Sequence, residues 1–350
     1  MKNMLKFKIF LLGALALIIT ACSRDDDNPT PGEAQTDVYV VGNGTKEIDG
    51  ITRYNVKLWK NGVVQNITDY PDNAKANSVF VSGNDVYIAG DEPGNGNFIA
   101  KLWKNGVGQN LTDGNLPARA NAVFVSGNDV YVAGRGDNED GLMVARLWKN
   151  GVEQQLTTTN TGSSEAHSVF VSGSDVYVAG YERQTGVKTA MVWKNGVPQN
   201  LTGDTDAEAY SVFISGNDVY VAGKGFHQTA DVAKLWKNGV VQNLTDGTYE
   251  AQAQSIFVSG NDVYVTGGEE NAGLKQEARL WKNGVLQPLT INSSTNTYGL
   301  SVAVSGDEVY IAGAEYGDGA DIPKLWKNGT PQELDATEEA MAYSVYVVQR

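Results

Sequence analysis

The chain has 350 residues, 41% of them hydrophobic, with 41 acidic and 27 basic side chains and a net charge of −14. This acidic balance repels phosphate backbones and anionic lipid headgroups, so it argues against nucleic-acid binding and against attachment to a membrane through charge. Cys22 is the single cysteine, which excludes a disulfide within the chain. The 40 glycines and the recurrent Val-Tyr-Val strings favour an all-β architecture.

The first residues have the pattern of a processing segment. Three lysines flank the start of an apolar run over residues 9–19, which is too short to span a bilayer. The run leads into Ile19-Thr20-Ala21-Cys22, which resembles a bacterial lipobox, where the cysteine thiol accepts a diacylglycerol. We therefore expect residues 1–21 to be a lipoprotein signal peptide and Cys22 to carry the lipid that is the protein's membrane contact. An ordinary secretory signal with an incidental cysteine is the alternative.

Residues 22–36 follow as a polar segment rich in Pro, Gly and Asp, which is typical of a flexible linker. The acidic run Asp25-Asp26-Asp27 resembles the surface-export signal of Bacteroidota lipoproteins, although Arg24 interrupts the match. The resemblance implies a location in the outer membrane, lipid-anchored and exposed at the cell surface. A plain solvated linker explains the same aspartates.

From residue 37 onward the sequence repeats. Trp-Lys-Asn-Gly begins at seven tryptophans spaced 43 to 45 residues apart, namely Trp59, Trp103, Trp148, Trp193, Trp236, Trp281 and Trp326. In one repeat, strand-like segments cover residues 78–82, 85–90, 100–104 and 107–112, and Gly83-Asn84 and Asn105-Gly106 have the composition of two-residue hairpin turns. This period with four strands per repeat is typical of a propeller blade.

The two chain ends fix the number of blades. The first strand, residues 37–42, lacks its inner neighbour, and the last strand, residues 344–348, lacks its outer neighbours. We therefore predict an all-β, seven-bladed β-propeller of four-stranded blades over residues 37–350, with the ring closed by the N- and C-terminal strands, because pairing the ends removes two open edges.

The segment Gly299–Gly313 is similar to the repeats of the NHL and YVTN propeller families. In those families the first strand of each blade lines a central channel, and the tight turns and the longer loops lie on opposite faces. The resemblance implies the same arrangement here, with variable loops at residues 91–97, 135–142, 181–189 and 268–277.

Catalytic patterns are absent from the sequence. The chain has two histidines, no nucleophile elbow and no zinc-ligand spacing, so we expect no catalytic residues, no metal site and no cofactor, and we expect a protein that is not an enzyme. The repeated tryptophans and the repeated tyrosines of the Val-Tyr strings are interpreted as packing between blades.

One position within the repeat changes in almost every copy. It directly precedes the strand that begins Ser-Val-Phe, and its residues are Asn77, Asn121, His167, Tyr210, Gln254, Leu300 and Tyr343. If these strands are innermost, the seven side chains surround the channel mouth on the loop face, where propellers commonly hold ligands, so they are our candidate ligand-binding residues. A tolerant junction between loop and strand is the alternative.

The function predicted from these features is recognition of an extracellular protein or glycan through the variable loop face, by a protein expected to be a monomer. The negative charge favours neutral or cationic partners. Two alternatives stay open: a carbohydrate-active hydrolase or lyase, and a purely structural or adhesion scaffold.

Overall fold

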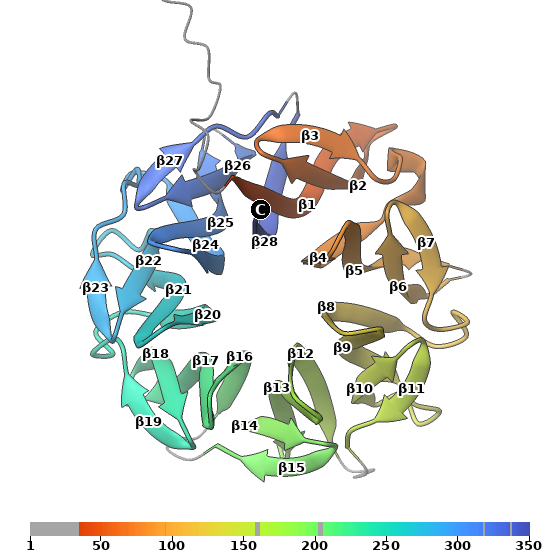
Figure 1. The fold of residues 1–350 in the computed structure, drawn as a ribbon, viewed down its shortest axis with the longest axis horizontal. Coiled ribbons are helices and arrows are strands. Elements are labelled where there is room, and N and C mark those ends of the chain that lie inside the picture. The colour runs from red at the N-terminus through yellow and green to blue at the C-terminus, as the bar shows by residue number, and fades with distance from the viewer. Residues whose placement is uncertain (1–34, 95, 158–161, 202–205, 318, 337) are drawn as a thin grey trace, which may run out of the picture. The chain divides into compact units, whose positions relative to one another are not determined.

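A computed structural model describes residues 35–94, 96–157, 162–201, 206–317, 319–336 and 338–350. Residues Thr36–Arg350 form one compact unit of seven four-stranded antiparallel sheets in a ring (Figure 1). The expected signal peptide, Cys22 and the linker up to residue 34 lie outside the described residues. Among the residues that are described, no helix is long and apolar enough to cross a membrane.

Each sheet is one blade, and its strands follow one another from the centre of the ring outward (Figure 1). Blade 1 comprises β4 (Lys75–Ser82), β5 (Asp85–Pro93), β6 (Phe98–Lys104) and β7 (Val107–Asn110), and blade 2 comprises β8 (Ala118–Ser126), β9 (Asp129–Asp137), β10 (Met143–Lys149) and β11 (Val152–Gln155). Blade 3 comprises β12 (Ser163–Ser172), β13 (Asp175–Gln184), β14 (Val187–Lys194) and β15 (Val197–Asn200), and blade 4 comprises β16 (Ala207–Ser215), β17 (Asp218–His227), β18 (Ala230–Lys237) and β19 (Val240–Asn243). Blade 5 comprises β20 (Ala251–Ser259), β21 (Asp262–Glu270), β22 (Gln276–Lys282) and β23 (Val285–Gln287), and blade 6 comprises β24 (Asn296–Ser305), β25 (Glu308–Gly317), β26 (Ala320–Lys327) and β27 (Thr330–Gln332).

Blade 7 is assembled from both ends of the chain. Its innermost strand is β28 (Ala340–Gln349), and its other strands are β1 (Thr36–Ile48), β2 (Ile51–Lys60) and β3 (Val63–Asn66), with the 3-10 turn η1 (Tyr70–Asp72) leading into blade 1. β28 pairs with β1 along its length and packs against β24 and β4, the innermost strands of the neighbouring blades. The predicted fold class and its closure by the terminal strands are thereby confirmed.

The hydrophobic core lies between neighbouring blades. At the junction of blades 1 and 2, Tyr87 and Leu102 pack against Val123, Val132 and Trp148. The seven repeated tryptophans are all at most 3% exposed. Because each interface buries side chains of two blades, a single blade cannot bury its own faces. Each blade therefore needs a neighbour on both sides, which the closed ring provides.

The hairpin turns lie on one face of the ring, which we call the turn face. In blade 1, the Asn105 side chain accepts a hydrogen bond from the backbone N–H of Val86 and donates one to Asp85, at 2.9 and 2.7 Å. Lys104 pairs with Asp85 at 2.7 Å and lies over the Tyr87 ring. Both turn residues at 105 and 106 have positive φ, the geometry that makes Asn-Gly favourable. The repeated Asp, Tyr, Lys and Asn therefore form one structural unit, and the same unit recurs in every blade with Glu308 replacing Asp in blade 6.

Every innermost strand contains a β-bulge near its start. In blade 2, Ala120 and Ala122 pair with Gly134 and Ala133, so the residue between them, Asn121, has no partner on β9. A Cβ on Gly134 would overlap the carbonyl oxygen of Arg119. The same shift recurs in all seven blades opposite the last residue of the Val-Tyr-Val-Ala-Gly string. This explains the repeated glycine, because only a residue without a side chain lets the bulged strand approach so closely.

Two rows of contacts connect the innermost strands around the ring. Aromatic rings at one position of the repeat lie 4.6–4.9 Å apart from strand to strand in an arc that ends at Ala303, and its members are Tyr346, Phe80, Phe124, Phe170, Phe213 and Phe257. Serine hydroxyls at another position accept a hydrogen bond from a backbone N–H of the next blade, as Ser78 does from Val123 at 3.2 Å. Blade 2 has Ala122 at this position and lacks the contact.

Candidate functional site

The bulges bring three side-chain positions per blade to the end of the channel opposite the turn face. These are the bulged residue, the residue two positions before it, and the residue of the second strand directly opposite the latter. We call this set the mouth. In blade order from 1 to 7 it consists of Lys75, Asn77 and Asp91; Arg119, Asn121 and Arg135; Glu165, His167 and Tyr181; Glu208, Tyr210 and Lys224; Gln252, Gln254 and Gly268; Tyr298, Leu300 and Ala314; and Met341, Tyr343 and Asn43.

The seven candidate ligand-binding residues are the bulged residues. All of them are partly buried, and each lies inside a strand that begins two to four residues earlier. The expectation that these residues directly precede the strand was therefore wrong, because the innermost strands extend further toward the mouth than the Ser-Val-Phe pattern indicates. The expected loops were also drawn too long, since β5, β9, β13 and β21 continue three or four residues into them. Asp91, Arg135 and Tyr181 are strand residues for this reason.

The bulged residues of blades 1 to 3 reach the next blade. The Asn77 amide donates to the carbonyl oxygen of Ala120 at 2.9 Å, and the Asn121 amide donates to Ala166 and to the Glu165 carboxylate at 2.9 and 3.0 Å. His167 packs edge-on against Tyr210, with ring centroids 5.4 Å apart. A bulge re-aims its unpaired side chain, and here it directs the side chain across the blade interface.

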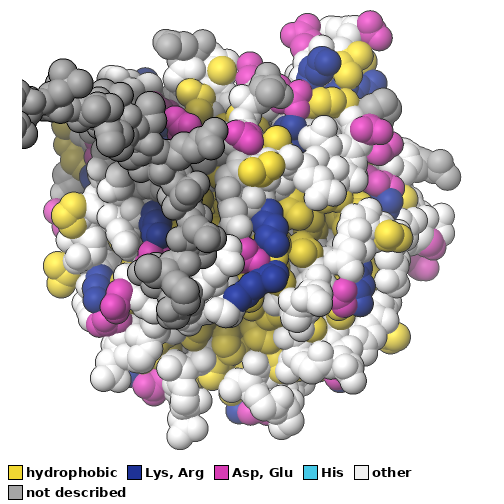
Figure 2. Space-filling view, turned by 45° about the horizontal axis from the view of Figure 1, so that its top comes forward, with side chains coloured by type: hydrophobic (Ala, Val, Ile, Leu, Met, Phe, Trp, Pro, Cys, Tyr) yellow, Lys and Arg dark blue, Asp and Glu magenta, His cyan; other side chains and the backbone are white. Residues whose placement is uncertain are grey.

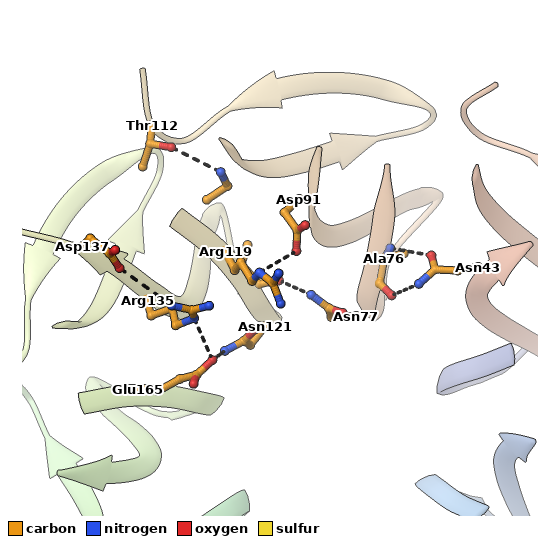
Figure 3. Close-up of polar contacts among 12 residues, drawn as sticks. Asn43, Ala76, Asn77, Asp91, Thr112, Arg119, Asn121, Arg135, Asp137 and Glu165 are labelled. Carbon is orange, nitrogen blue, oxygen red and sulfur yellow. Dashed lines mark hydrogen bonds and ion pairs between the residues drawn. The ribbon is translucent and has the colours of Figure 1, made fainter. Parts of the chain in front are cut away.

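The charges of the mouth are confined to blades 1 to 4, which we call the charged half. In this half Arg119 approaches Asp91 of blade 1, with nitrogen and oxygen 3.9 Å apart, and Arg135 lies 3.4 Å from Glu165 of blade 3 (Figure 3). Glu208 contacts Lys188 at 2.8 Å, farther out on β14. The three mouth positions of blades 5, 6 and 7 carry no charged side chain. On the face shown in Figure 2, acidic and basic side chains are interspersed.

Burial changes the protonation of several mouth groups. It lowers the pKa of His167 although the charges of Glu165 and Glu208 oppose it, so the imidazole is neutral near pH 7. It raises the pKa of Asp91, against the charges of Arg119 and Lys75. It also raises the pKa of Tyr181 to about 12 and that of Tyr210 still further. The charged half therefore combines a neutral histidine, two tyrosine hydroxyls and the three carboxyl groups of Asp91, Glu165 and Glu208.

Several buried polar atoms of the mouth have no hydrogen-bond partner among the described residues. They are Asp91 Oδ2, Arg119 Nε, His167 Nε2 and Gln254 Oε1. Buried polar atoms in folded proteins are nearly always paired, and exceptions concentrate where a ligand or a reaction needs them. On the turn face, by contrast, the repeated Asp and Asn side chains are bonded within each blade.

Three pockets lie away from the mouth, and no mouth residue lines them. A pocket of about 500 Å³ lies between blades 1 and 2 on the loop side, lined by Thr112, Asp137, Glu139 and Arg146 among others. Pockets of about 520 and 290 Å³ lie on the turn face, and both are built from the same repeat positions in different blades, which identifies them as products of blade packing. No cluster of three or more metal-ligating side chains occurs in the described part of the chain.

The sequence indicated the bulged position in each blade as a candidate, and it placed Asp91, Arg135, Tyr181 and Gly268 only as the first residues of the expected variable loops; the other mouth positions were missed. All the charged side chains of the mouth lie outside the seven candidates, namely Lys75, Asp91, Arg119, Arg135, Glu165, Glu208 and Lys224. A usable signal was present, because the residue after the repeated glycine also changes in every blade: Asp91, Arg135, Tyr181, Lys224, Gly268, Ala314 and Asn43.

The fold and the mouth define the class of this protein as a seven-bladed β-propeller with four-stranded blades and a varied channel mouth. No protein-family model matches the chain, and no curated protein matches it. Among solved structures it is similar to the acylaminoacyl peptidase of Pyrococcus horikoshii, with 13% identity and a TM-score of 0.54 over 85% of this chain and 51% of that one. The chain thus spans about half the length of that peptidase.

A second similar structure is the β-propeller domain of the trilobed protease from Pyrococcus furiosus, with 12% identity and a TM-score of 0.54 over 85% of this chain and 94% of that domain. That domain is described as having an open velcro topology, whereas here β28 pairs with β1. At these identities the likeness concerns the fold alone.

Proposed function

We propose that this protein is a binding protein that takes an extracellular protein or glycan at its mouth and the surrounding loops. The observation that carries the proposal is the contrast between the two faces. The turn face repeats one self-satisfied unit seven times, while the mouth presents a different set of side chains in every blade and leaves buried polar atoms unpartnered. Unlike side chains converging on one opening are what selective recognition of a partner requires.

The test is binding of the full chain to panels of glycans and extracellular proteins, followed by variants on the two faces. Tyr210→Ala with Tyr343→Ala should weaken binding of any ligand found by at least ~1 kcal/mol if these rings are contact residues. The matched control is Val107→Ala with Val240→Ala, since these side chains are 74% and 72% exposed on the turn face. Because both tyrosines are largely buried, the Phe variants serve as a second pair that preserves packing. Loss of binding in the valine control, with the tyrosine variants unaffected, would show that the binding site lies on the turn face and would contradict the proposal.

The proposal includes a lipid tether. Cys22 in its lipobox-like context and the acidic segment after it support anchoring in the outer membrane, with the ring held outside the cell as a monomer. Cys22→Ala should abolish fatty-acid labelling of the protein and release it from membranes. Labelling that persists in the variant would contradict the anchor, and failure of external protease to cleave the protein on intact cells would contradict surface exposure.

A second candidate function is cleavage of a polysaccharide. It is favoured by His167, which burial keeps neutral and which lies 4.0 Å from Glu208 and packs on Tyr181 and Tyr210. A neutral imidazole beside tyrosine hydroxyls can accept and return a proton in a hydrolase or lyase. Release of new reducing ends or of unsaturated sugars from a polysaccharide panel, lost in His167→Ala, would establish this function in place of simple binding.

A further inference from the structure

Two arginines face each other directly in the charged half. Arg119 on β8 and Arg135 on β9 are register partners, so their side chains leave the same face of blade 2 as nearest neighbours. Like charges directly opposite on paired strands destabilise a sheet. Figure 3 shows the two guanidinium groups side by side between Asp91 and Glu165. A pair that costs stability at the mouth of a channel indicates a use other than folding.

The carboxylates around this pair leave much of its hydrogen-bonding capacity unused. A carboxylate oxygen of Asp91 lies 3.9 Å from Arg119 Nε, and oxygens of Glu165 and Asp137 lie 3.4 and 3.8 Å from Arg135. Charge-assisted hydrogen bonds are shorter, about 2.7–2.9 Å. Ion pairs elsewhere in the protein reach that range, as Lys224 does with Asp231 at 2.6 Å.

Access and geometry fit an anion with two oxygens. The Arg119 side chain is 38% exposed, with its guanidinium carbon 4.8 Å from the centroid of the Phe98 ring of blade 1, and the Arg135 side chain is 19% exposed, so solvent reaches both in part. Arg119 Nε is nevertheless buried without a hydrogen-bond partner among the described residues. A guanidinium group presents a planar fork of donors that matches a carboxylate. Lys75 stands on the neighbouring innermost strand, where burial and the charge of Arg119 lower its pKa against the charge of Asp91.

Tyrosines contact Lys75 and His167, the mouth residues of the blades on either side of blade 2. On the side of blade 7, Tyr54 lies beneath Lys75, with its ring centroid 3.8 Å from the ammonium nitrogen. On the side of blades 3 and 4, Tyr181 and Tyr210 pack around His167. Aromatic faces with hydroxyl tips, next to amides and carboxylates, suit a ring that is apolar on its faces and polar at its edge. A sugar has this character.

We propose that the mouth binds an acidic sugar, a uronic-acid unit of a glycan, and that Arg119 and Arg135 receive its carboxylate. This inference rests on the proposed function and names its ligand class. It departs from the expectation of neutral or cationic partners, because that expectation used the charge of the whole chain, whereas a ligand at the mouth meets the local charges first.

The experiment compares two probes on the full chain by calorimetric titration: a short oligosaccharide of galacturonic acid and the same oligosaccharide with its carboxylates methyl-esterified. We expect the acid to bind about tenfold or more tightly than the ester, as loss of a hydrogen-bonded charge pair implies. The affinity for the acid should fall with added salt while that for the ester stays constant. Both comparisons use the unaltered protein and so do not depend on a variant that folds.

Variants then locate the contact. Arg119→Gln and Arg135→Gln should remove the preference for the acid, and Arg135→Lys should restore it only in part, because a lysine keeps the charge but not the fork. Lys104→Gln and Lys149→Gln, which remove one charge each on the turn face, are the matched controls and should keep the preference.

Equal affinity for acid and ester would overturn the inference while leaving the proposed function standing. Binding of a peptide with a free C-terminal carboxylate in place of the acidic sugar would also overturn it. Absence of binding to both probes overturns the inference, and if the panels of glycans and proteins yield nothing either, the proposed function fails with it.

Discussion

The turn face and the mouth are built from the opposite ends of the same strands, yet they differ in how polar groups are satisfied. On the turn face each blade completes its own hydrogen bonds, as Asn105 does with Val86 and Asp85. At the mouth the bonds run from blade to blade, as Asn77 donates to Ala120, and some buried atoms stay unpartnered. A self-contained unit can be copied seven times without change. Mouth residues contact a different neighbour in each blade and therefore cannot be copied unchanged. The mouth is accordingly where the side chains differ from blade to blade.

The largest expected effect tests whether the mouth depends on its bulges. Gly134→Ala should lower the free energy of unfolding by about 3 kcal/mol, since the added methyl group would meet the Arg119 carbonyl oxygen and overpack the strand pair. Chemical denaturation measures it. Gly127→Ala is the control, because a Cβ there meets nothing within 4 Å and only its φ of 59° is unfavourable, at about 1–2 kcal/mol. Equal losses in the two variants would show that the bulge is not the reason for the repeated glycine.

A smaller effect tests whether the turn face is truly one unit repeated. Asn105→Ala should cost about 2 kcal/mol, because it removes two hydrogen bonds and places alanine at a positive φ. Asn150→Ala should cost the same in blade 2, where the contacts are alike. Urea unfolding of both variants measures the difference. A clear inequality between the two blades would mean that the turn face is also specialised.

The pH dependence of stability tests the charged half. Burial lowers the pKa of His167 below its ordinary 6.5 in the folded protein, so the unfolded chain takes up the proton first and stability falls as the pH drops below 6.5. One such group contributes at most about 1.4 kcal/mol between pH 6.5 and 5.5. His167→Gln should therefore show a flatter profile in denaturation experiments over this window. An unchanged slope would indicate that the imidazole takes up its proton at the same pH in the folded and the unfolded chain, against a lowered pKa in the folded state.

The smallest expected effect is a gain. Ala122→Ser should add the inter-blade hydrogen bond that blade 2 lacks, from the backbone N–H of Val169, and raise the free energy of unfolding by about 0.5–1 kcal/mol. The reverse change, Ser78→Ala, should cost a similar amount at the neighbouring interface. If Ala122→Ser is neutral or destabilising, the interface between blades 2 and 3 differs in geometry from the interfaces that contain the serine contact. The blade interfaces would then be less uniform than the hairpin units of the turn face.

The sequence by itself determined the blades and their closure. The spacing of the Trp-Lys-Asn-Gly strings marks one blade at a time, and the hairpin turns follow from residues adjacent in the chain, such as Asn105 and Gly106. The unpaired strands at residues 37–42 and 344–348 required each other. These features were predictable because local backbone chemistry and strong repetition both act at short range.

Only the tertiary structure decided what the mouth contains. The bulge at Asn121 and the equivalent bulges of the other blades depend on a strand pairing that shifts by one residue. No pattern of hydrophobic residues indicates this shift. Arg119 and Arg135 are 16 positions apart along the chain but directly opposite in the sheet, and Asp91 approaches Arg119 from another blade. Such neighbours are set by register and by the closing of the ring, and both are settled by the packing of the whole molecule because each interface needs side chains from two blades.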